Sequence, residues 1–362
     1  MVKRVLIYRL GSLGDTVMAL PALHLVERAF PHARRVLLTN MPTHSNAPAA
    51  SAVLEGSGLV HGYMEYPWKT RSVRDLLRLW WKIVRFRPQV AVYLMRKRGE
   101  HSLKRDTALF RLCGVREVIG LPTGDLAEPL YDPATDLWEQ EGARLARCLR
   151  SRLGEVDVHD PANWDLRLTA EEQEKARAVL APFEGRPLIA CGPGTKMQSK
   201  DWGEENWRAL LTRLTAELPD HGLVLIGAAQ DSAVSMNASA GWRGPVANLC
   251  GLPPRETAAV LRHVELFLGP DSGQMHMAGA YGVPCAIVFA SRLRRGHWFP
   301  SGEGHEVIYH KVECSLCELE ECVANQRKCI MSISIEEMLA AALKARKRGA
   351  GMPVRAGEGR RA

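Results

Sequence analysis

Three short segments of the sequence place glycines beside residues that can bind a ligand or accept a proton. The first, Arg-Leu-Gly-Ser-Leu-Gly-Asp, runs from Arg9 to Asp15. Gly11 and Gly14 let the backbone approach a ligand closely, Ser12 adds a hydroxyl, and the segment ends in a carboxylate. That carboxylate could act as a general base toward an attacking hydroxyl. Alternatively, Asp15 serves only as the N-cap of the helix that follows.

The second segment is Gly-Pro-Gly-Thr-Lys at residues 192–196, with Lys200 just behind it. A strand that ends in such a turn exposes backbone N–H groups, and Thr195, Lys196 and Lys200 add a hydroxyl and two cations. This is a suitable cradle for a leaving diphosphate, on which negative charge grows as its bond to the transferred group breaks. A polar loop with solvated lysines would have the same composition.

The third segment, Gly-Pro-Asp-Ser-Gly-Gln-Met-His, covers residues 269–276. An apolar strand leads into Ser272 and Gly273, which begin a helix of small residues. The unpaired N–H groups and partial positive charge of a helix N-terminus favour phosphate binding. Asp271 could accept hydrogen bonds from sugar hydroxyls, and His276 could reach a phosphate. A buried histidine with a purely structural role is the alternative.

Strand and helix patterns alternate along the whole chain, which is typical of doubly wound parallel sheets. Strands are expected at residues 3–9, 35–39, 59–63, 89–94 and 117–119, and then at 188–191, 223–226, 246–249, 266–268 and 285–289. Helices are expected from Asp15 onward and at 204–218, 255–263 and 273–281, and capping boxes at Thr169 and Ser334 open two more. All three glycine-bearing segments follow strands, where open parallel sheets bind ligands.

The two alternating series predict an α/β protein with two Rossmann-like domains of ordinary size. We expect an N-terminal domain over residues 1–163 and a C-terminal domain over residues 164–330. A last helix with a basic tail is expected over residues 331–362. No run approaches the roughly 18 apolar residues of a membrane span, and no signal-peptide core is evident, so a cytoplasmic location is predicted.

The formal net charge of +8 is concentrated in residues 69–105 and after residue 344, which suits an anionic partner. Arg96 and Arg98 follow a strand and could meet a phosphorylated acceptor. Residues 71–87 form a basic amphipathic helix whose apolar stripe is Leu76, Leu79, Trp80, Ile83 and Val84. Such stripes usually face a core. With Leu77 and Trp81 pointing outward, however, the helix could rest on anionic lipid of the inner membrane leaflet.

Nine cysteines without an export signal indicate thiols rather than disulfides. Four of them lie close together near the C-terminus: Cys314, Cys317, Cys322 and Cys329. Four thiolates can hold a structural zinc ion, and Cys-x2-Cys is a usual first pair of ligands. The second pair is spaced differently from common zinc modules, so structural thiols are the alternative.

Together these motifs resemble glycosyltransferase family 9, the heptosyltransferase-like enzymes of lipopolysaccharide assembly, over nearly the whole chain. The resemblance depends on the order of Gly-Ser-Leu-Gly-Asp-Thr-Val and Leu-Pro-Ala-Leu at 11–23, Pro-Gly at 193–194, Lys-Asp-Trp and Glu-Asn-Trp at 200–207, and Asp-Ser-Gly-x-Met-His and Gly-Val-Pro at 271–284.

The resemblance implies the GT-B fold, in which two Rossmann-like domains face a central cleft, with the acceptor on the first and the donor on the second. The last helix is then expected to pack back toward the first domain. It further implies inverting transfer without a catalytic metal or other cofactor. The donor would be a nucleotide sugar, with ADP-heptose suggested, and the acceptor a lipopolysaccharide core, another glycolipid, another glycan or a protein. No nucleic-acid partner is expected.

Carried over by position, Asp15 is the implied catalytic base. The implied donor ligands are Thr195, Lys200, Ser272, Gly273 and His276 for phosphate, with Lys196 as a further cation and Asp271 for sugar hydroxyls. Gly11, Ser12, Gly14, Arg96 and Arg98 are expected on the acceptor side. The family often has an acidic residue that holds the ribose after the strand ending at Gly227. Here Gly-Ala-Ala-Gln-Asp at 227–231 leaves that contact open.

Two other classes of protein fit the scaffold. A non-catalytic protein that binds nucleotide sugars or nucleic acid would use the same domains, although aromatic stacking platforms beside the basic tracts are not evident. A sugar-nucleotide epimerase or dehydrogenase is also built from Rossmann units, but the chain lacks Gly-x-Gly-x-x-Gly.

Overall fold

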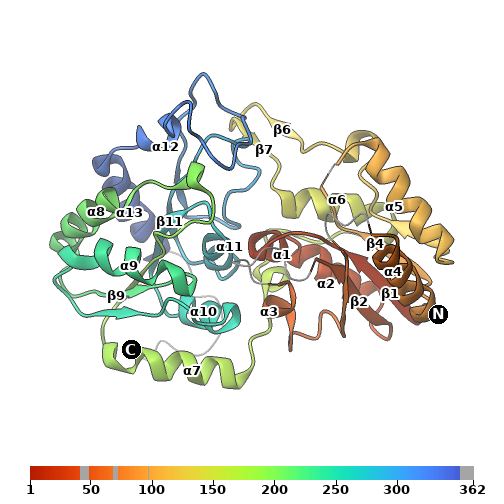
Figure 1. Ribbon diagram of the computed structural model, residues 1–362. Helices are drawn as coiled ribbons and strands as arrows, with labels where there is room; N and C mark the ends of the chain where they lie inside the picture. Colours follow the sequence, from red (N-terminus) through yellow and green to blue (C-terminus); the bar gives the residue numbers. More distant parts are fainter. Residues whose placement is uncertain (41–48, 68–71, 97, 351–362) are drawn as a thin grey trace. The chain divides into compact units, whose positions relative to one another are not determined.

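The computed structural model describes residues 1–40, 49–67, 72–96 and 98–350. The chain divides into two compact units, Met1–Thr169 and one that begins at Ala170 (Figure 1). The division falls a few residues after the expected boundary at 163. Lys97 and the basic tail over 351–362 lie outside the described residues.

The first unit is built on a five-stranded sheet in the order β3-β2-β1-β4-β5, and every strand pair is parallel. The strands are β1 (Arg4–Tyr8), β2 (Arg34–Thr39), β3 (Tyr63–Glu65), β4 (Val90–Tyr93) and β5 (Glu117–Ile119). Strand order therefore reverses between β1 and β4. The expected strands are confirmed except that the third pairs at 63–65 rather than at 59–63.

The helices of this unit connect the strands and cover the sheet. They are α1 (Leu13–Met18), α2 (Leu20–Ala29), α3 (Ser51–Leu54), α4 (Val73–Phe86), α5 (Glu100–Leu112) and α6 (Glu141–Leu153). Helices α4 and α5 bury Leu79, Ile83 and Phe110 against Leu6 and Tyr8 of the central strand, while α2 packs on α6. A short antiparallel hairpin, β6 (Tyr131–Asp132) and β7 (Leu137–Trp138), precedes α6. Its strands are too short to show alternation in the sequence.

The helix expected to start at Asp15 starts earlier and is divided in two. Ser12 is the N-cap of α1, so Asp15 is the third residue of the helix and not its cap. The chain leaves α1 at Ala19, and Pro21 stands in the first turn of α2. Proline lacks an N–H group and is favoured in the first turn of a helix, so it marks the start of a new one.

The second unit is built on a six-stranded sheet in the order β10-β9-β8-β11-β12-β13, again with parallel pairs throughout. Its strands are β8 (Leu188–Cys191), β9 (Gly222–Leu225), β10 (Val246–Asn248), β11 (Leu266–Pro270), β12 (Cys285–Val288) and β13 (Glu306–Ile308). Strand order reverses between β8 and β11. The edge strand β13 was not predicted, because only two of its three residues are apolar.

Seven helices of this unit are described: α7 (Ala170–Leu180), α8 (Glu204–Glu217), α9 (Ser232–Ala238), α10 (Pro254–Leu261), α11 (Gly273–Ala280), α12 (Lys328–Met331) and α13 (Ile335–Ala350). Helix α13 packs against α8, β11, β12 and β13 and buries Met338, Ala342 and Ala345 in the core of this unit. These contacts lie within the second unit, and the expected packing of the last helix toward the first unit stays a prediction. Among the described residues, no helix is both long and apolar enough to span a bilayer.

Candidate active site

In each unit, the residues singled out from the sequence gather where strand order reverses. In the first unit, residues 11–15 follow β1 and residues 96 and 98 follow its neighbour β4. In the second unit, residues 195–200 follow β8 and residues 271–276 follow its neighbour β11. The carboxyl ends of parallel strands at such a reversal form the usual ligand-binding crevice.

The Asp15 carboxylate is tied to the start of its own helix. Its Oδ2 accepts hydrogen bonds from the backbone N–H of Ser12 at 2.8 Å and from the Ser12 hydroxyl at 2.9 Å. The first of these bonds satisfies the Ser12 N–H, which a helix start would otherwise leave unpaired. The Asp15 side chain still keeps 27% of its surface exposed. As the third residue of the helix it therefore supports the N-cap Ser12, and it is also accessible to a ligand.

The buried side chain of Arg9 contacts both the carbonyl and the carboxylate of Asp15. Arg9 donates through Nη2 to the Asp15 carbonyl at 2.8 Å, and the same nitrogen lies 3.3 Å from Asp15 Oδ1. Arg9 Nη1 donates to the carbonyl of Leu94, the residue after β4, at 2.8 Å. Only 4% of the Arg9 side chain is exposed. One guanidinium thus joins the two strand ends and compensates the charge of the carboxylate.

Two residues of α6 hold Arg9 in turn. Glu141 has no exposed side-chain surface and lies 3.5 Å from Arg9 Nη1. Arg144 donates two hydrogen bonds to the Glu141 carboxylate, at 2.7 and 2.8 Å, and a third to the Met95 carbonyl at 3.2 Å. Such two-pronged arginine–carboxylate pairs fix orientation as well as charge. The Asp15 loop is therefore anchored by three buried ionic groups.

Gly11 is required by the same packing. A Cβ atom at this position would lie 2.4 Å from both Cβ and Cγ of Asp15, well inside van der Waals contact. The Gly11 N–H donates to the Asn40 side chain at 2.8 Å. Glycine at this position lets the loop fold over the carboxylate. Gly14 lies inside α1.

Arg96 and Arg98 differ in their surroundings. Arg98 donates to Asp106 at 2.5 Å and to the Tyr8 hydroxyl at 3.0 Å, and its side chain is mostly buried. Burial raises the pKa of Tyr8 and Tyr93, the latter to about 12, so both stay neutral hydroxyls. Asp106 is then the acid that balances Arg98. Arg96 is exposed, so of the two it is the better candidate for an acceptor phosphate.

In the second unit, Lys200 and Asp271 form an ion pair across the strand reversal. Lys200 Nζ lies 2.6 Å from Asp271 Oδ2 and donates to the Asp271 carbonyl at 3.3 Å. The two side chains are 13% and 5% exposed. A pair this sheltered from water keeps more of its Coulomb attraction than one on the surface. The cation is thereby held beside the start of α11.

Helix α11 begins as the sequence predicts. Ser272 is its N-cap and accepts a hydrogen bond from the Met275 N–H at 3.4 Å, and Gly273 is its first residue. The helix start therefore lies at the end of β11 beside the Lys200 ammonium group. His276 is buried, with its ring edge-to-face against Trp298 at 5.9 Å. Its expected contact with phosphate stays a prediction.

The loop after β8 is shaped by the carboxylate of Asp231, which lies in the turn after β9. A Cβ atom on Gly194 would lie 2.3 Å from Asp231 Cγ, and Asp231 Oδ2 accepts from the Ala228 N–H at 2.8 Å. Thr195 accepts a weak hydrogen bond from the Met197 N–H at 3.3 Å, and Lys196 is exposed. Asp231 thus lies between the loops after β8 and β9, in the stretch for which the sequence left the nucleotide contact open.

The family model for glycosyltransferase family 9 (heptosyltransferase) matches residues 145–328, just over half of the chain. The chain belongs to this family. The match runs from α6 to the start of α12 and includes the Lys200–Asp271 pair, whereas Asp15 precedes it. A comparison with curated protein sequences gives no match.

Solved structures of similar enzymes cover nearly all of this glycosyltransferase. A family 9 glycosyl transferase from Veillonella parvula is 16% identical with a TM-score of 0.71, over 95% of this chain and 97% of its own. The ADP-heptose lipopolysaccharide heptosyltransferase II of E. coli is 15% identical with a TM-score of 0.65, over 96% and 100%. The E. coli heptosyltransferase WaaC with ADP is 15% identical with a TM-score of 0.64, over 94% and 99%. The fold of this family 9 enzyme is therefore GT-B.

The four cysteines near the C-terminus, Cys314, Cys317, Cys322 and Cys329, do not support the suggested structural zinc. Within the described residues, no three or more His, Cys, Asp or Glu side chains are arranged to hold a metal ion. Cys322 is buried, Cys317 is exposed, and Cys314 and Cys329 are half-buried. The segment that carries these cysteines contacts the Lys200 loop: the backbone N–H and hydroxyl of Ser199 donate to the carbonyls of Glu320 and Leu319 at 3.0 and 2.8 Å.

The buried network behind Asp15 was missed from the sequence of the glycosyltransferase. A signal for Arg9 was present, because a charged residue ends an apolar strand at a position where burial is expected. Glu141 and Arg144 lie three residues apart on a helix, a spacing that equally describes an exposed surface pair. Only the packing of α6 beside the β1 and β4 ends distinguishes the two cases.

Proposed function

We propose that this glycosyltransferase moves a heptose from a nucleoside-diphosphate sugar to a hydroxyl of a glycolipid acceptor, such as a lipopolysaccharide core. The observation that carries the proposal is the Lys200–Asp271 pair beside the start of α11, where the strand order reverses. A cation and a helix N-terminus together suit a diphosphate. The similar E. coli enzymes are described as ADP-heptose heptosyltransferase II and as WaaC with ADP, which favours ADP-heptose as the donor.

The proposed reaction is a single displacement with inversion at the anomeric carbon. Asp15 accepts the proton of the attacking hydroxyl as the new carbon–oxygen bond forms. The bond from the anomeric carbon to the diphosphate breaks on the opposite side, and its electron pair leaves with the diphosphate. Lys200 and the amides at the start of α11 stabilise that growing charge, with Lys196 and Thr195 as further donors. No catalytic metal takes part.

Asp271 has two roles in this proposal. Before the donor binds, its carboxylate compensates Lys200 in a site sheltered from water. When the donor binds, its diphosphate replaces the Asp271 carboxylate as an ion-pair partner of the Lys200 ammonium group. The Asp271 oxygen released in this way accepts hydrogen bonds from sugar hydroxyls. Because each charge exchanges one partner for another, donor binding leaves neither of them buried alone.

Asp15→Asn tests the proposed base. The amide keeps an oxygen that can accept from the Ser12 N–H but cannot take up a proton, so turnover should fall about 10²- to 10⁴-fold. Donor affinity should stay within a few-fold, because the donor contacts lie in the other unit. The measurements are initial rates and calorimetric binding of ADP-heptose.

Ser12→Ala is the matched control, because it removes the hydroxyl bonded to Asp15 but keeps the carboxylate. It should cost about 1 kcal/mol of stability and only a small part of the turnover. If the two variants lose stability and activity equally, Asp15 is a helix cap and not a base.

A panel of nucleotide sugars identifies the donor. ADP-heptose should raise the melting temperature of the protein most and should then be consumed in the presence of a glycolipid acceptor, with and without chelator. Stabilisation without transfer or hydrolysis would favour the non-catalytic binding protein instead. Loss of turnover on chelation would refute the metal-independent reaction.

A further inference from the structure

The apolar side chains of helix α4 extend well beyond the side that faces the core of its unit. Leu79 and Ile83 are buried in the core of the first unit. Val73, Leu77 and Trp81 are spaced four residues apart and form a second row, and they are 68%, 58% and 56% exposed. A surface helix needs a single apolar stripe to pack on its domain. The second row contributes nothing to that packing.

Neighbouring residues enlarge this exposed apolar row. Leu76 and Trp80 are 46% and 40% exposed. Leu112, at the end of α5, is 76% exposed, and its carbonyl accepts from Trp80 Nε1 at 3.4 Å. The exposed apolar groups therefore form one patch across two helices. Isolated exposed apolar residues need no explanation, but a contiguous patch marks an interaction site.

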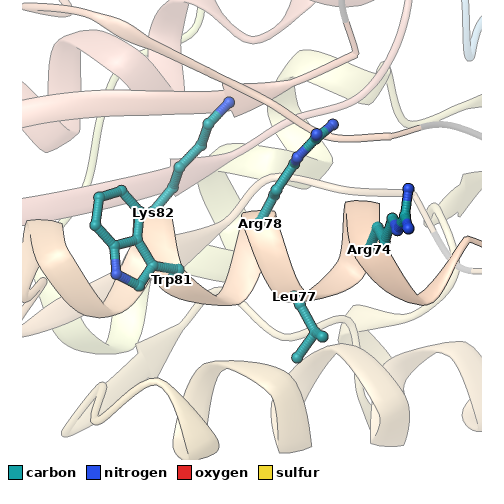
Figure 2. Close-up of a pocket in the computed structure, with 5 residues that line it drawn as sticks. All are labelled: Arg74, Leu77, Arg78, Trp81 and Lys82. Carbon is teal, nitrogen blue, oxygen red and sulfur yellow. The ribbon is translucent and has the colours of Figure 1, made fainter.

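A row of cations borders the patch. Arg74, Arg78 and Lys82 are also spaced four residues apart, and with Leu77 and Trp81 they line an open groove of about 560 Å³. Figure 2 shows the three cations pointing to the same side of α4, with Leu77 directed away from them. Arg85 lies over the Trp81 ring at 5.4 Å. Four cations thus adjoin the patch, and the carboxylate on the same helix is Asp75, 3.6 Å from Arg78.

We propose that this α4 surface, made of Val73, Leu77, Trp81, Arg74, Arg78 and Lys82, rests on an anionic lipid bilayer. The apolar row would enter the boundary between headgroups and acyl chains while the adjoining cations meet lipid phosphates, as in interfacial helices. Tryptophan favours this boundary because its ring is apolar and its N–H is polar. A second copy of the chain is a poorer occupant, because it would bring its own cations against these.

The proposal is independent of the transfer reaction. Binding to vesicles needs neither donor nor turnover, so the α4 surface can fail while the glycosyltransferase proposal stands, and the reverse also holds. None of the α4 surface residues belongs to the candidate active site, so their variants should keep turnover on a water-soluble acceptor fragment.

Sedimentation of the full chain with vesicles tests the proposal. The wild-type protein should bind vesicles of phosphatidylcholine mixed with phosphatidylglycerol at low salt, and should bind far less at high salt or to phosphatidylcholine alone. R74Q/R78Q/K82Q should weaken binding about 100-fold, since each cation near an anionic surface contributes roughly fivefold. L77S/W81S should weaken binding at both salt concentrations, because it removes the apolar part.

Matched controls change the same kinds of side chain elsewhere. R177Q/K328Q/K344Q removes three exposed cations from the second unit, and V234S/M236S removes two exposed apolar residues from α9. Both should bind acidic vesicles like the wild type. Failure of the wild type to bind at low salt, or equal losses in the controls, would overturn the proposal. Self-association that L77S/W81S abolishes, without vesicle binding, would instead identify the surface as an interface between copies.

Discussion

The Asp15 side chain depends on residues from three separate parts of the first unit. Ser12 donates to one carboxylate oxygen, Arg9 lies beside the other, Glu141 pairs with Arg9, and Arg144 holds Glu141. These groups are close to each other only because α6 returns to the ends of β1 and β4. The position of a catalytic carboxylate matters, since a displacement of about 1 Å can cost 10²-fold in rate.

Glu141→Gln should therefore lower turnover more than it lowers donor affinity. The amide can still accept from Arg144, but it no longer compensates two buried guanidinium groups, so stability should fall by up to about 3–5 kcal/mol. At temperatures well below unfolding, we expect the turnover number to drop roughly 10- to 100-fold. Rates, donor affinity and denaturant unfolding should be measured together.

Glu139→Gln is the control for this prediction. Glu139 pairs with Arg147 at 2.7 Å and is also well sheltered, so its variant likewise removes a charge of an arginine–carboxylate pair. Its variant should lose stability with little effect on turnover at a temperature where the protein is folded. Equal kinetic effects in both variants would mean that Glu141 acts on folding alone.

At the scale of the element, the position of α11 depends on a glycine far from its N-cap. A Cβ atom on Gly279 would lie 2.8 Å from the Ser301 nitrogen and 2.9 Å from Pro300 Cβ. The small residues of α11 thus let it pack closely against the loop before β13. Displacing the helix there would also displace Ser272 and the amides proposed to bind diphosphate.

Gly279→Ala should lower both the stability of the protein and its affinity for the donor. In an exposed helix, alanine in place of glycine stabilises by about 0.5–1 kcal/mol. Here overpacking should instead destabilise the protein by about 1–3 kcal/mol, and ADP-heptose should bind more weakly. Chemical denaturation and calorimetry measure the two effects. A more stable variant with normal donor affinity would show that the loop at Pro300 and Ser301 moves to accommodate the methyl group. The position of α11 would then not depend on this contact.

At the scale of the whole molecule, each unit buries a histidine that resists protonation. His24 is 4% exposed and its Nε2 lies 2.8 Å from the Asp165 carbonyl, while His221 lies just before β9 and is 5% exposed. Burial lowers the pKa of both, with Arg167 adding to the effect at His24 and Arg346 at His221. Both histidines are therefore neutral in the folded protein near pH 7.

Because these pKa values are lowered in the folded protein, the free energy of unfolding should fall as the pH falls. Because the unfolded histidines bind protons more tightly, unfolding takes up protons once the pH falls below the ordinary pKa of 6.5. The free energy of unfolding should be steady above about pH 7 and should decline as the pH falls toward 5. His24→Gln should make this decline shallower. An unchanged pH profile would mean that His24 contributes nothing to the acid sensitivity.

Most of the fold could be predicted from the sequence, because buried parallel strands are continuous apolar runs and because some helices, such as α11 and α13, begin at a clear cap. The strand β5 was predicted residue for residue, and the capping box at Ser334 is present, with Ser334 donating to Glu337 at 2.8 Å. Elements with weak local signals were missed: the hairpin β6–β7, the edge strand β13 and the break at Ala19.

The candidate site was predicted only in part, because its residue types are local and their partners are not. The carboxylate of Asp15, the cation of Lys200 and the N-cap Ser272 stand beside glycines at strand ends, so the sequence by itself indicated them. That Lys200 pairs with Asp271, that Arg98 is balanced by Asp106, and that Glu141 supports Arg9 was decided by the tertiary structure. Strand order brings these charges together, and burial then makes each depend on an opposite charge that lies far away in the chain.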